Sequence, residues 1–455
     1  MFDPGEFGGG KALVIGAGKS GIACANLLTA RGFDVLLTEE KKATEVRDRL
    51  KALSRRVKVE TGGHGKGALA CAFAVKSPGM SHSNPLIKAL KKKRIPVFSE
   101  IEIALAYSRA RKFLAVTGTN GKTTTTVLLG ELMKAALRPR GRAVVCGNVG
   151  VPAALAAPKA RPSDAVIMEV SSYQLEDSSG IKPDAACVLN ITPDHLDHHG
   201  GMAAYVRAKE KVFRLQGPDD CCVFNYEDAY CRGLARTCPS QALFFSSARR
   251  GGRLNAWTEG GKLFFRSGGL KFSVAPPALP GAHNLENAMC AGLMALHCGA
   301  RPAHLRRGFA AFRGVEHRIE RAGAARGIVF YNDSKATNVD STLVALRALG
   351  GRRNIWLILG GLGKGTPYSP LKPLIRSSVK GILTIGKDAP AIEAQLAGSA
   401  PLITAQTMQN ACREILELGE KGDIALFSPA CASFDQFRDF EDRGRSFKDF
   451  VGTLK

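Results

Sequence analysis

A short glycine-rich segment holds the residues whose types and spacing best suit chemistry. It reads Phe113-Leu-Ala-Val-Thr-Gly118-Thr-Asn-Gly121-Lys122-Thr123-Thr124, an apolar run followed by a glycine turn, a lysine and threonines. In a phosphate loop, backbone N–H groups surround the phosphate oxygens, the lysine reaches the β and γ phosphates, and a hydroxyl binds Mg²⁺. The segment therefore predicts an ATP site with Lys122 as its catalytic cation, formed by Gly118, Thr119, Asn120, Gly121, Lys122, Thr123 and Thr124.

The spacing of this turn differs from that of the general phosphate-loop motif. The two glycines enclose two residues, where the general motif encloses four. A chance glycine turn before a helix is the alternative interpretation. The complete set of strand, turn, lysine and threonine argues against it.

Side chains that could hold the metal follow two further apolar runs. Glu169 lies near the end of the run 164–170, and a carboxylate at a strand terminus can bind a metal beside the phosphates. His195 lies in Asn190-Ile-Thr-Pro-Asp194-His195-Leu-Asp197-His198, which gathers histidines and aspartates. We predict metal positions at both places, because the upstream phosphate loop indicates a magnesium nucleotide. Without that loop, the histidines would be interpreted as ordinary surface residues.

The elements that must position these residues alternate between apolar strands and helical patterns along nearly the whole chain. Buried strands are predicted at 11–15, 112–116, 165–170, 186–189, 354–359 and 423–427. Three of them run into glycine turns, at 16–21 (GAGKSG), 118–124 (GTNGKTT) and 360–365 (GGLGKG). Such turns are where parallel α/β sheets bind anions, so the fold class is α/β with mostly parallel sheets.

Length and charge set the domain count and the classes of partner. A chain of 455 residues predicts about three domains, with boundaries at 1–110, 111–314 and 315–455. The net charge of +24 favours anionic ligands. Basic residues are spread along the chain, and the run 91–94 is interpreted as a solvated helix end. Without an RNA-binding or zinc-finger signature, no nucleic-acid partner is predicted, and a nucleic-acid-binding phosphate-loop protein is an alternative that rests on charge alone.

Other sequence features point to a cytoplasmic protein. No run of about 18 uncharged apolar residues is present, and the first residues lack the pattern of a signal peptide. We therefore expect a cytoplasmic location and no membrane partner. A monomer is also expected. The 12 scattered cysteines have no metal-type spacing and are expected to be free thiols. The Gly/Arg-rich segment 248–253 predicts a hairpin or loop between short strands.

The first glycine turn allows more than one ligand. Gly16-Ala-Gly18-Lys19-Ser20-Gly21 follows a strand and ordinarily suggests a dinucleotide, with Glu39 or Glu40 placed to hold a ribose hydroxyl. A nicotinamide-dependent dehydrogenase is therefore one alternative. It does not explain Lys122, Glu169 or His195.

A series of motifs resembles the central domain of the Mur ligase family, in order and at similar spacing. The series is GTNGKTT (118–124), GNVG (147–150), EVSSYQLE (169–176), NITPDHLDHH (190–199), AYVRAKEKVF (204–213), HNLEN (283–287) and EHR (316–318). The resemblance implies three domains: a Rossmann-like N-terminal domain that binds UDP, a central ATPase-like domain and a Rossmann-like C-terminal domain. It covers nearly the whole chain.

The resemblance also implies roles for individual residues. One Mg²⁺ would bind Thr123 and Glu169, and a second would bind His195 and Lys209, the latter as a carbamate. An unmodified ammonium group has no lone pair for a metal. Further ATP contacts would come from Asn284, Asn287, Arg318, Asp333 and Lys335, and contacts to the UDP substrate from Gly18, Lys19, Ser20, Thr38, Ser77 and Asn148.

The resemblance implies that the last domain decides which amino acid is added. DSKATN (333–338) and SPACASFDQF (428–437) closely resemble the family members that add D-glutamate. Two lysines and hydroxyl donors suit a ligand with two carboxylates, because buried carboxylates need charge-assisted hydrogen bonds. The implied D-glutamate residues are Lys335, Thr337, Lys364, Ser433 and Phe440. For Ser433 and Phe440, helix capping and packing are the alternative.

The resemblance thus implies an ATP- and Mg²⁺-dependent amide ligase that joins D-glutamate to UDP-N-acetylmuramoyl-L-alanine through an acyl phosphate, in peptidoglycan precursor synthesis. Folylpolyglutamate synthetase is the alternative within ligases, since it shares the phosphate loop. Those enzymes begin nearly at the loop, whereas about 110 residues precede it here.

Overall fold

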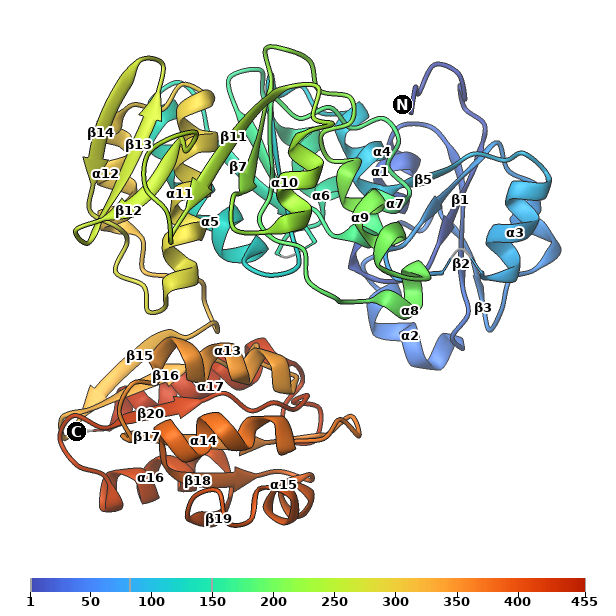
Figure 1. Ribbon diagram of the computed structural model, residues 1–455. Helices are drawn as coiled ribbons and strands as arrows, with labels where there is room; N and C mark the ends of the chain where they lie inside the picture. Colours follow the sequence, from blue (N-terminus) through green and yellow to red (C-terminus); the bar gives the residue numbers. More distant parts are fainter. Residues whose placement is uncertain (1, 82, 149, 455) are drawn as a thin grey trace. The chain divides into compact units, whose positions relative to one another are not determined.

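The computed structural model describes residues 2–81, 83–148 and 150–454. The chain forms two compact units (Figure 1). The first comprises Met1–Pro277 and Leu285–Phe312, and the second comprises Ala278–Asn284 and Arg313–Lys455. The predicted three-domain boundaries remain a prediction.

The first unit begins with a five-stranded, wholly parallel sheet of order β3-β2-β1-β4-β5. Because the chain moves from β1 to β2 on one side and then to β4 on the other, the turn after β1 lies where the strand order reverses. The elements are β1 (Lys11–Ile15), α1 (Lys19–Ala30), β2 (Asp34–Glu39), α2 (Ala43–Leu50), β3 (Lys58–Thr61), η1 (Lys66–Leu69), β4 (Phe73–Lys76), α3 (Pro85–Lys92), β5 (Val97–Ser99) and α4 (Glu100–Ala106).

The same unit contains a nine-stranded sheet of order β14-β13-β12-β11-β10-β9-β6-β8-β7. Strands β6 to β12 pair in parallel, and the antiparallel β13 and β14 extend one edge. Its elements are β6 (Lys112–Thr117), α5 (Lys122–Leu137), β7 (Ala143–Gly147), α6 (Ala153–Ala156), η2 (Ala157–Lys159), β8 (Ala165–Glu169), α7 (Ser172–Glu176), β9 (Ala185–Val188), α8 (Leu196–His199), α9 (Met202–Glu210), β10 (Cys221–Asn225), α10 (Ala229–Ala235), β11 (Gln241–Ser246), β12 (Ala256–Glu259), β13 (Lys262–Ser267), β14 (Leu270–Val274), α11 (Ala282–His297) and α12 (Pro302–Ala311).

The second unit is built on a six-stranded sheet of order β15-β16-β20-β17-β18-β19, parallel except for the edge strand β15. Apolar clusters fill both faces of this sheet. Its elements are β15 (Glu320–Ala325), β16 (Ile328–Asn332), α13 (Val339–Leu349), β17 (Ile355–Gly360), η3 (Ser369–Leu371), α14 (Lys372–Ser378), β18 (Val379–Ile385), α15 (Ala389–Leu396), β19 (Leu402–Gln406), α16 (Met408–Leu418), β20 (Ile424–Phe427) and α17 (Phe440–Thr453).

These three sheets confirm the predicted fold class. The predicted strands are continuous apolar runs because helices cover both faces of a parallel sheet, and β8 is accordingly buried at every position. The run 91–94 is the exposed end of α3, as expected. The segment 248–253 is a loop and not a hairpin, because β11 and β12 on either side of it pair in parallel.

One further expectation, that of free thiols, is met. All 12 cysteines are free thiols. None of the helices formed by the described residues has the length and apolar character that crossing a membrane requires.

A buried carboxyl group fastens the two sheets of the first unit together. Glu100, the first residue of α4, is 1% exposed, and its Oε1 accepts a hydrogen bond from the backbone N–H of Ala154 at 2.6 Å. Its Oε2 is buried without a hydrogen-bond partner among the described residues. Burial raises the pKa of Glu100 to about 7, despite the lowering effect of the Ala154 N–H.

This carboxyl group should make stability depend on pH. The folded-state pKa lies above the unfolded one, so the folded state binds more protons between roughly pH 4.5 and 7, and the free energy of unfolding falls as pH rises through that window. Glu100→Gln should flatten the dependence and raise the free energy of unfolding at pH 8 by about 2 kcal/mol. Urea denaturation at pH 5 and pH 8 measures this. Glu131→Gln on α5 is the control, and an equal slope in Glu100→Gln and wild type would refute the assignment.

Candidate functional site

Strand order places the predicted phosphate loop beside the predicted metal ligands. Strand β6 lies between β8 and β9, with Val116 opposite Glu169 and Thr117 opposite Val188. The carboxyl ends of parallel strands meet at one edge of a sheet, so the segments starting at Gly118, Glu169 and Leu189 come together there.

The phosphate loop has the backbone conformation that its glycines allow. Gly121 precedes α5 with φ of 82°, and a Cβ there would lie 2.3 Å from Asn287 Oδ1. Lys122 opens α5, and its Nζ donates to the carbonyls of Gly118 at 2.9 Å and Thr119 at 2.7 Å. The ammonium group therefore lies over the loop in which phosphates would sit.

Hydrogen bonds fasten this loop to the segment 190–199. Thr119 Oγ1 donates to Thr192 O at 3.2 Å, accepts from Thr192 N at 3.0 Å, and lies 3.0 Å from Tyr205 Oη. Asn120 N donates to Asn190 Oδ1 at 2.8 Å, and Asn190 Nδ2 donates back to Asn120 O. The sequence offered no signal for Tyr205 beyond its place in AYVRAKEKVF.

Glu169 has the oxygen atoms that a metal requires. The residue is 2% exposed, and its Oε1 accepts from Asn148 Nδ2 at 3.1 Å. Its Oε2 is buried without a hydrogen-bond partner in the described part of the chain. A buried carboxylate oxygen without a donor is costly unless a cation binds it. Thr123, 5% exposed, opens the neighbouring helix beside Lys122.

The structure brings Lys209 to the phosphate loop. Lys209 is 1% exposed, its Nζ donates to Gly118 O at 2.8 Å, and it lies 4.6 Å from the Tyr205 ring centroid. Burial, and then the charge of Lys122, lower the pKa of Lys209 well below its usual value. His195 precedes α8 with φ of 54°, and its half-exposed ring pairs with Asp194 at 3.4 Å.

The first glycine turn has a different architecture from the phosphate loop. Gly18 caps α1, and Lys19 and Ser20 are its first residues. Thr38 is buried and bonds His64 Nδ1 at 2.9 Å, while Ser77 Oγ donates to Gly16 O at 3.4 Å. Five of the six predicted substrate residues thus lie around one turn at the carboxyl ends of β1, β2 and β4, while Asn148 lies beside Glu169.

Glu39 holds this turn in a way that spacing alone did not predict. Its Oε2 accepts from Ala17 N at 2.7 Å and its Oε1 from Lys41 N at 3.0 Å. Burial would raise the pKa of Glu39, but these two hydrogen bonds and nearby Lys41 bring it below its usual value. A ribose hydroxyl would therefore have to compete with these two backbone N–H groups for the Glu39 carboxylate.

The predicted amino-acid residues gather at one edge of the second unit's sheet. DSKATN follows β16, GGLGKG follows β17, and SPACAS follows β20, which lies between them. Lys335 is half-buried with its Nζ 5.9 Å from the ring centroid of Phe440, the first residue of α17. Thr337 N donates to Lys335 O at 2.9 Å, Ser433 is buried, and Lys364 is exposed.

Sequence reasoning missed Arg443, which joins two of these loops. Arg443 is 1% exposed, and its Nη2 donates to Ser334 O at 2.8 Å and Cys431 O at 3.1 Å. Its Nε donates to Ser334 Oγ at 2.9 Å, and its Nη1 to Ala432 O at 3.3 Å. Burial lowers the pKa of Arg443 to about 10. A single arginine in a helical pattern carries no signal that its partners are loop carbonyls.

Polar residues predicted to contact ATP lie in both units. In the second unit, Asp333 is buried, its Oδ2 accepts from Ser428 Oγ at 2.7 Å, and burial raises its pKa to about 7. Arg318 Nε is buried without a hydrogen-bond partner among the described residues, and Asn284 Nδ2 donates to Pro280 O at 2.7 Å. In the first unit, Asn287 Oδ1 accepts from Thr125 Oγ1 at 3.2 Å.

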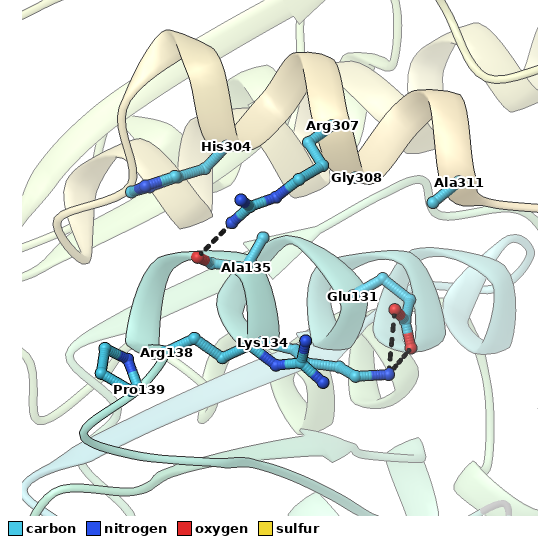
Figure 2. Close-up of a pocket in the computed structure, with 9 residues that line it drawn as sticks. All are labelled: Glu131, Lys134, Ala135, Arg138, Pro139, His304, Arg307, Gly308 and Ala311. Atoms are coloured by element: carbon cyan, nitrogen blue, oxygen red, sulfur yellow. Dashed lines mark hydrogen bonds and ion pairs between the residues drawn. The ribbon is translucent and has the colours of Figure 1, made fainter.

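A separate cavity of about 570 Å³ lies between α5 and α12, away from these residues (Figure 2). Lys134, Arg138, His304 and Arg307 line it, together with Glu131. Arg307 Nη2 donates to Ala135 O at 2.9 Å, which ties the two helices together. None of the predicted site residues lines this cavity.

A phosphate loop on a mostly parallel sheet, with a buried carboxylate at the neighbouring strand, defines a nucleotide-binding α/β protein. Family models match the Mur ligase MurD-like N-terminal domain at residues 10–99, the Mur ligase middle domain at 116–295 and the Mur ligase glutamate ligase domain at 317–431. The chain belongs to the Mur ligase family. The match at 10–99 covers the segment that distinguishes it from folylpolyglutamate synthetases.

Similar proteins extend over the full length. The chain is 44% identical to the UDP-N-acetylmuramoylalanine–D-glutamate ligase of Elusimicrobium minutum, covering 100% of both chains. It is 38% identical to the ligase of the same name from Koribacter versatilis, covering 98% of both. Among solved structures, UDP-N-acetylmuramate-alanine ligase MurC from Thermotoga maritima has a TM-score of 0.62 at 19% identity, covering 98% of this chain and 100% of that one. This last likeness concerns the fold.

Proposed function

We infer that this protein is an ATP-dependent ligase that forms an amide bond between D-glutamate and UDP-N-acetylmuramoyl-L-alanine in peptidoglycan synthesis. The observation that carries this inference is the match over the whole chain to relatives named for that reaction, at 44% identity for the ligase of Elusimicrobium minutum. The phosphate loop and the basic groups beside it are consistent with the ATP-dependent half of the reaction.

The reaction has two steps, and neither needs a nucleophilic side chain. A carboxylate oxygen of the acceptor attacks the γ phosphorus of ATP, which forms an acyl phosphate and releases ADP. The amine of D-glutamate then attacks the acyl carbon, and phosphate and a proton leave. Lys122 would neutralise charge on the transferred phosphoryl oxygens, and positioning supplies the remaining rate enhancement.

The residues at the carboxyl end of β6 and β8 fit a magnesium ion. Glu169 offers a buried Oε2 that has no hydrogen-bond partner among the described residues, and Thr123 offers a hydroxyl at the start of α5. A bound Mg²⁺ would supply charge neutralisation at the phosphates and a fixed phosphate geometry. Asn148 would orient Glu169 through the 3.1 Å bond to Oε1.

Lys209 could act as a metal ligand only after its amine has been modified. As an ammonium group, Lys209 donates to Gly118 O and has no lone pair for a cation. The pKa of Lys209 is lowered by burial and by Lys122, so a larger share of its amine is neutral, and the neutral amine is the form that adds CO₂. We therefore propose that Lys209 acts as a carbamate, with His195 as the companion ligand.

The carbamate has a direct test. Enzyme stripped of CO₂ at low pH and assayed in CO₂-free buffer should lose most of its turnover, and bicarbonate should restore it. Lys209→Ala should be inactive both in CO₂-free buffer and with added bicarbonate. A short-chain carboxylic acid should restore its turnover, because its carboxylate can take the place of the carbamate. Full turnover without CO₂ would exclude the carbamate.

Lys335 is proposed to bind a carboxylate of D-glutamate. Lys335→Met should raise the KM for D-glutamate about ten- to a hundredfold, because a charge-assisted hydrogen bond is lost, and should leave the KM for the UDP substrate nearly unchanged. Steady-state kinetics with each substrate varied measures this. Lys421→Met, an exposed lysine before the amino end of β20, is the matched control. Equal rises in both KM values would place Lys335 elsewhere.

Phosphate release from ATP tests the function as a whole. The assay contains Mg²⁺ and UDP-N-acetylmuramoyl-L-alanine and compares D-glutamate with L-glutamate, L-alanine, L-lysine and meso-diaminopimelate. We expect release with D-glutamate alone. Release with another amino acid would keep the ligase and overturn the assignment of DSKATN, and no release with any would overturn the proposed reaction.

A further inference from the structure

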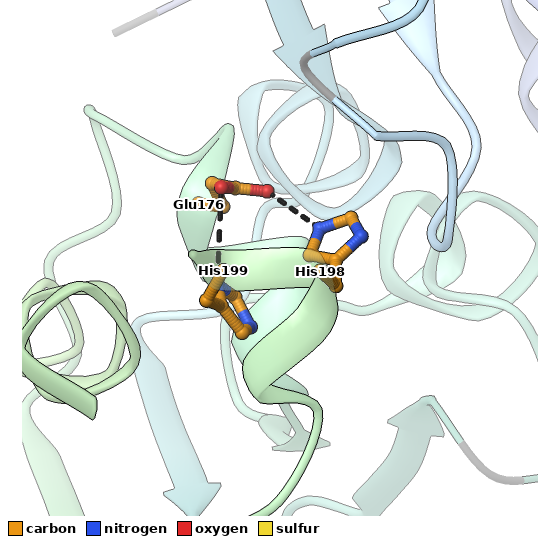
Figure 3. Close-up of side chains that lie close together, drawn as sticks. All are labelled: Glu176, His198 and His199. Atoms are coloured by element: carbon orange, nitrogen blue, oxygen red, sulfur yellow. Dashed lines mark hydrogen bonds and ion pairs between the residues drawn. The ribbon is translucent and has the colours of Figure 1, made fainter. Parts of the chain in front are cut away.

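Three side chains with metal-binding atoms converge in the first unit, apart from the ligands assigned to Mg²⁺ (Figure 3). Glu176 is the last residue of α7, and His198 and His199 end α8. One ligand atom from each residue can be chosen so that all three lie within 4.8 Å of one another. His198 Nε2 lies 3.0 Å from Glu176 Oε2, and His199 Nδ1 lies 3.8 Å from Glu176 Oε1.

Surrounding groups hold the two imidazoles in place. His199 Nε2 lies 3.0 Å from Ser172 Oγ, which leaves Nδ1 directed at Glu176. A hydrogen bond to the second ring nitrogen is the usual way in which proteins orient a metal-binding histidine. The Tyr173 ring packs on His198 at 4.3 Å and on His199 at 5.6 Å between centroids. Side-chain exposure is 1% for His199, 10% for His198 and 22% for Glu176, so the cluster opens on the side of Glu176.

Two ammonium groups, those of Lys76 and Lys211, lie near Glu176. Lys76 Nζ lies 3.8 Å from Glu176 Oε2 but is closer to Asp177, at 2.7 Å, and also donates to Met80 O at 2.6 Å. The stronger partner of Lys76 is therefore Asp177. Lys211 Nζ donates to the backbone carbonyl of Glu176.

We propose that Glu176, His198 and His199 form a site for a divalent transition-metal ion of the zinc type, separate from the nucleotide magnesium. Two imidazole nitrogens and one carboxylate oxygen are a ligand set that suits zinc and cobalt, while Mg²⁺ prefers oxygen ligands. Ligand atoms of a tetrahedral zinc site stand roughly 3.4 Å apart, so the cluster needs only small side-chain shifts. Water would complete the coordination on the open side.

Cobalt is a suitable probe, because Co²⁺ in a tetrahedral site with imidazole ligands absorbs visible light strongly, whereas Co²⁺ in an octahedral site of oxygen ligands absorbs only weakly. The full chain is titrated with Co²⁺ without nucleotide or Mg²⁺, and Zn²⁺ is then added as a competitor. We expect one equivalent to bind with a visible band that Zn²⁺ removes. His198→Gln and Glu176→Gln should each weaken Co²⁺ binding at least tenfold, while His304→Gln on α12 should not.

Two outcomes would overturn the proposal. One is a wild-type chain that shows no visible band at a Co²⁺ concentration well above that of the protein. The other is binding that survives in His198→Gln but is lost in His195→Gln, which would place the ion on the predicted magnesium ligand. Circular dichroism of each variant establishes that it is folded, and Glu176→Gln, which preserves shape, keeps the test valid if a histidine variant unfolds.

Discussion

Replacing Lys122 with alanine should lower the turnover of ATP by about a thousandfold or more, with the fold intact. Lys122 Nζ already lies over the loop carbonyls of Gly118 and Thr119, where it would meet phosphate oxygens. Loss of a cation that stabilises the transferred phosphoryl group typically costs three to five powers of ten in rate, on the order of 4–7 kcal/mol. Phosphate release under saturating substrates measures the effect.

Lys134→Ala is the matched control for Lys122→Ala. Lys134 lies on the same helix α5 and pairs on the surface with Glu131 at 3.3 Å. Its loss should change turnover less than about twofold, because exposed ion pairs contribute little. Near-normal turnover in Lys122→Ala would show that Lys122 does not bind the transferred phosphate.

Arg443→Met should lower the free energy of unfolding of the second unit by about 3 kcal/mol. The guanidinium donates to the backbone carbonyls of Ser334, Cys431 and Ala432. Methionine removes this donor from all three, and among the described residues only Ala432 O keeps another, the N–H of Leu362. Each unsatisfied buried group costs about 1–3 kcal/mol. The variant also removes the desolvation penalty of the buried arginine charge, which offsets part of this loss of stability. Chemical denaturation followed by far-ultraviolet circular dichroism measures the change.

The same variant should weaken the use of D-glutamate, because Arg443 joins the loops that carry Lys335 and Ser433. The expected result is a KM for D-glutamate that rises several-fold while the KM for the UDP substrate is unchanged. Arg438→Met is the control, since Arg438 pairs on the surface with Asp442 at 3.3 Å. An Arg443→Met protein with wild-type stability would show that the loops hold their shape without the guanidinium.

Much of the fold could be predicted from local patterns. Continuous apolar runs predicted the strands β1, β6, β8, β9, β17 and β20 to within a residue or two, because a strand of a parallel sheet is buried on both faces. For the segment 248–253, the sequence allowed either a hairpin or a loop between strands. Only the parallel pairing of β11 with β12, which is a long-range property, decided it.

The sequence by itself determined the family, and it predicted the phosphate loop and the polar residues around each glycine turn, since these depend on residue types at short spacing. The tertiary structure decided which of those residues meet. Strand order places β6 between β8 and β9, and this brings Gly118 and Glu169 to one edge. The burial of Lys209 and the hydrogen bonds of Arg443 to three backbone carbonyls depend on packing between segments far apart in the chain. No periodic or local pattern in the sequence indicates either of them.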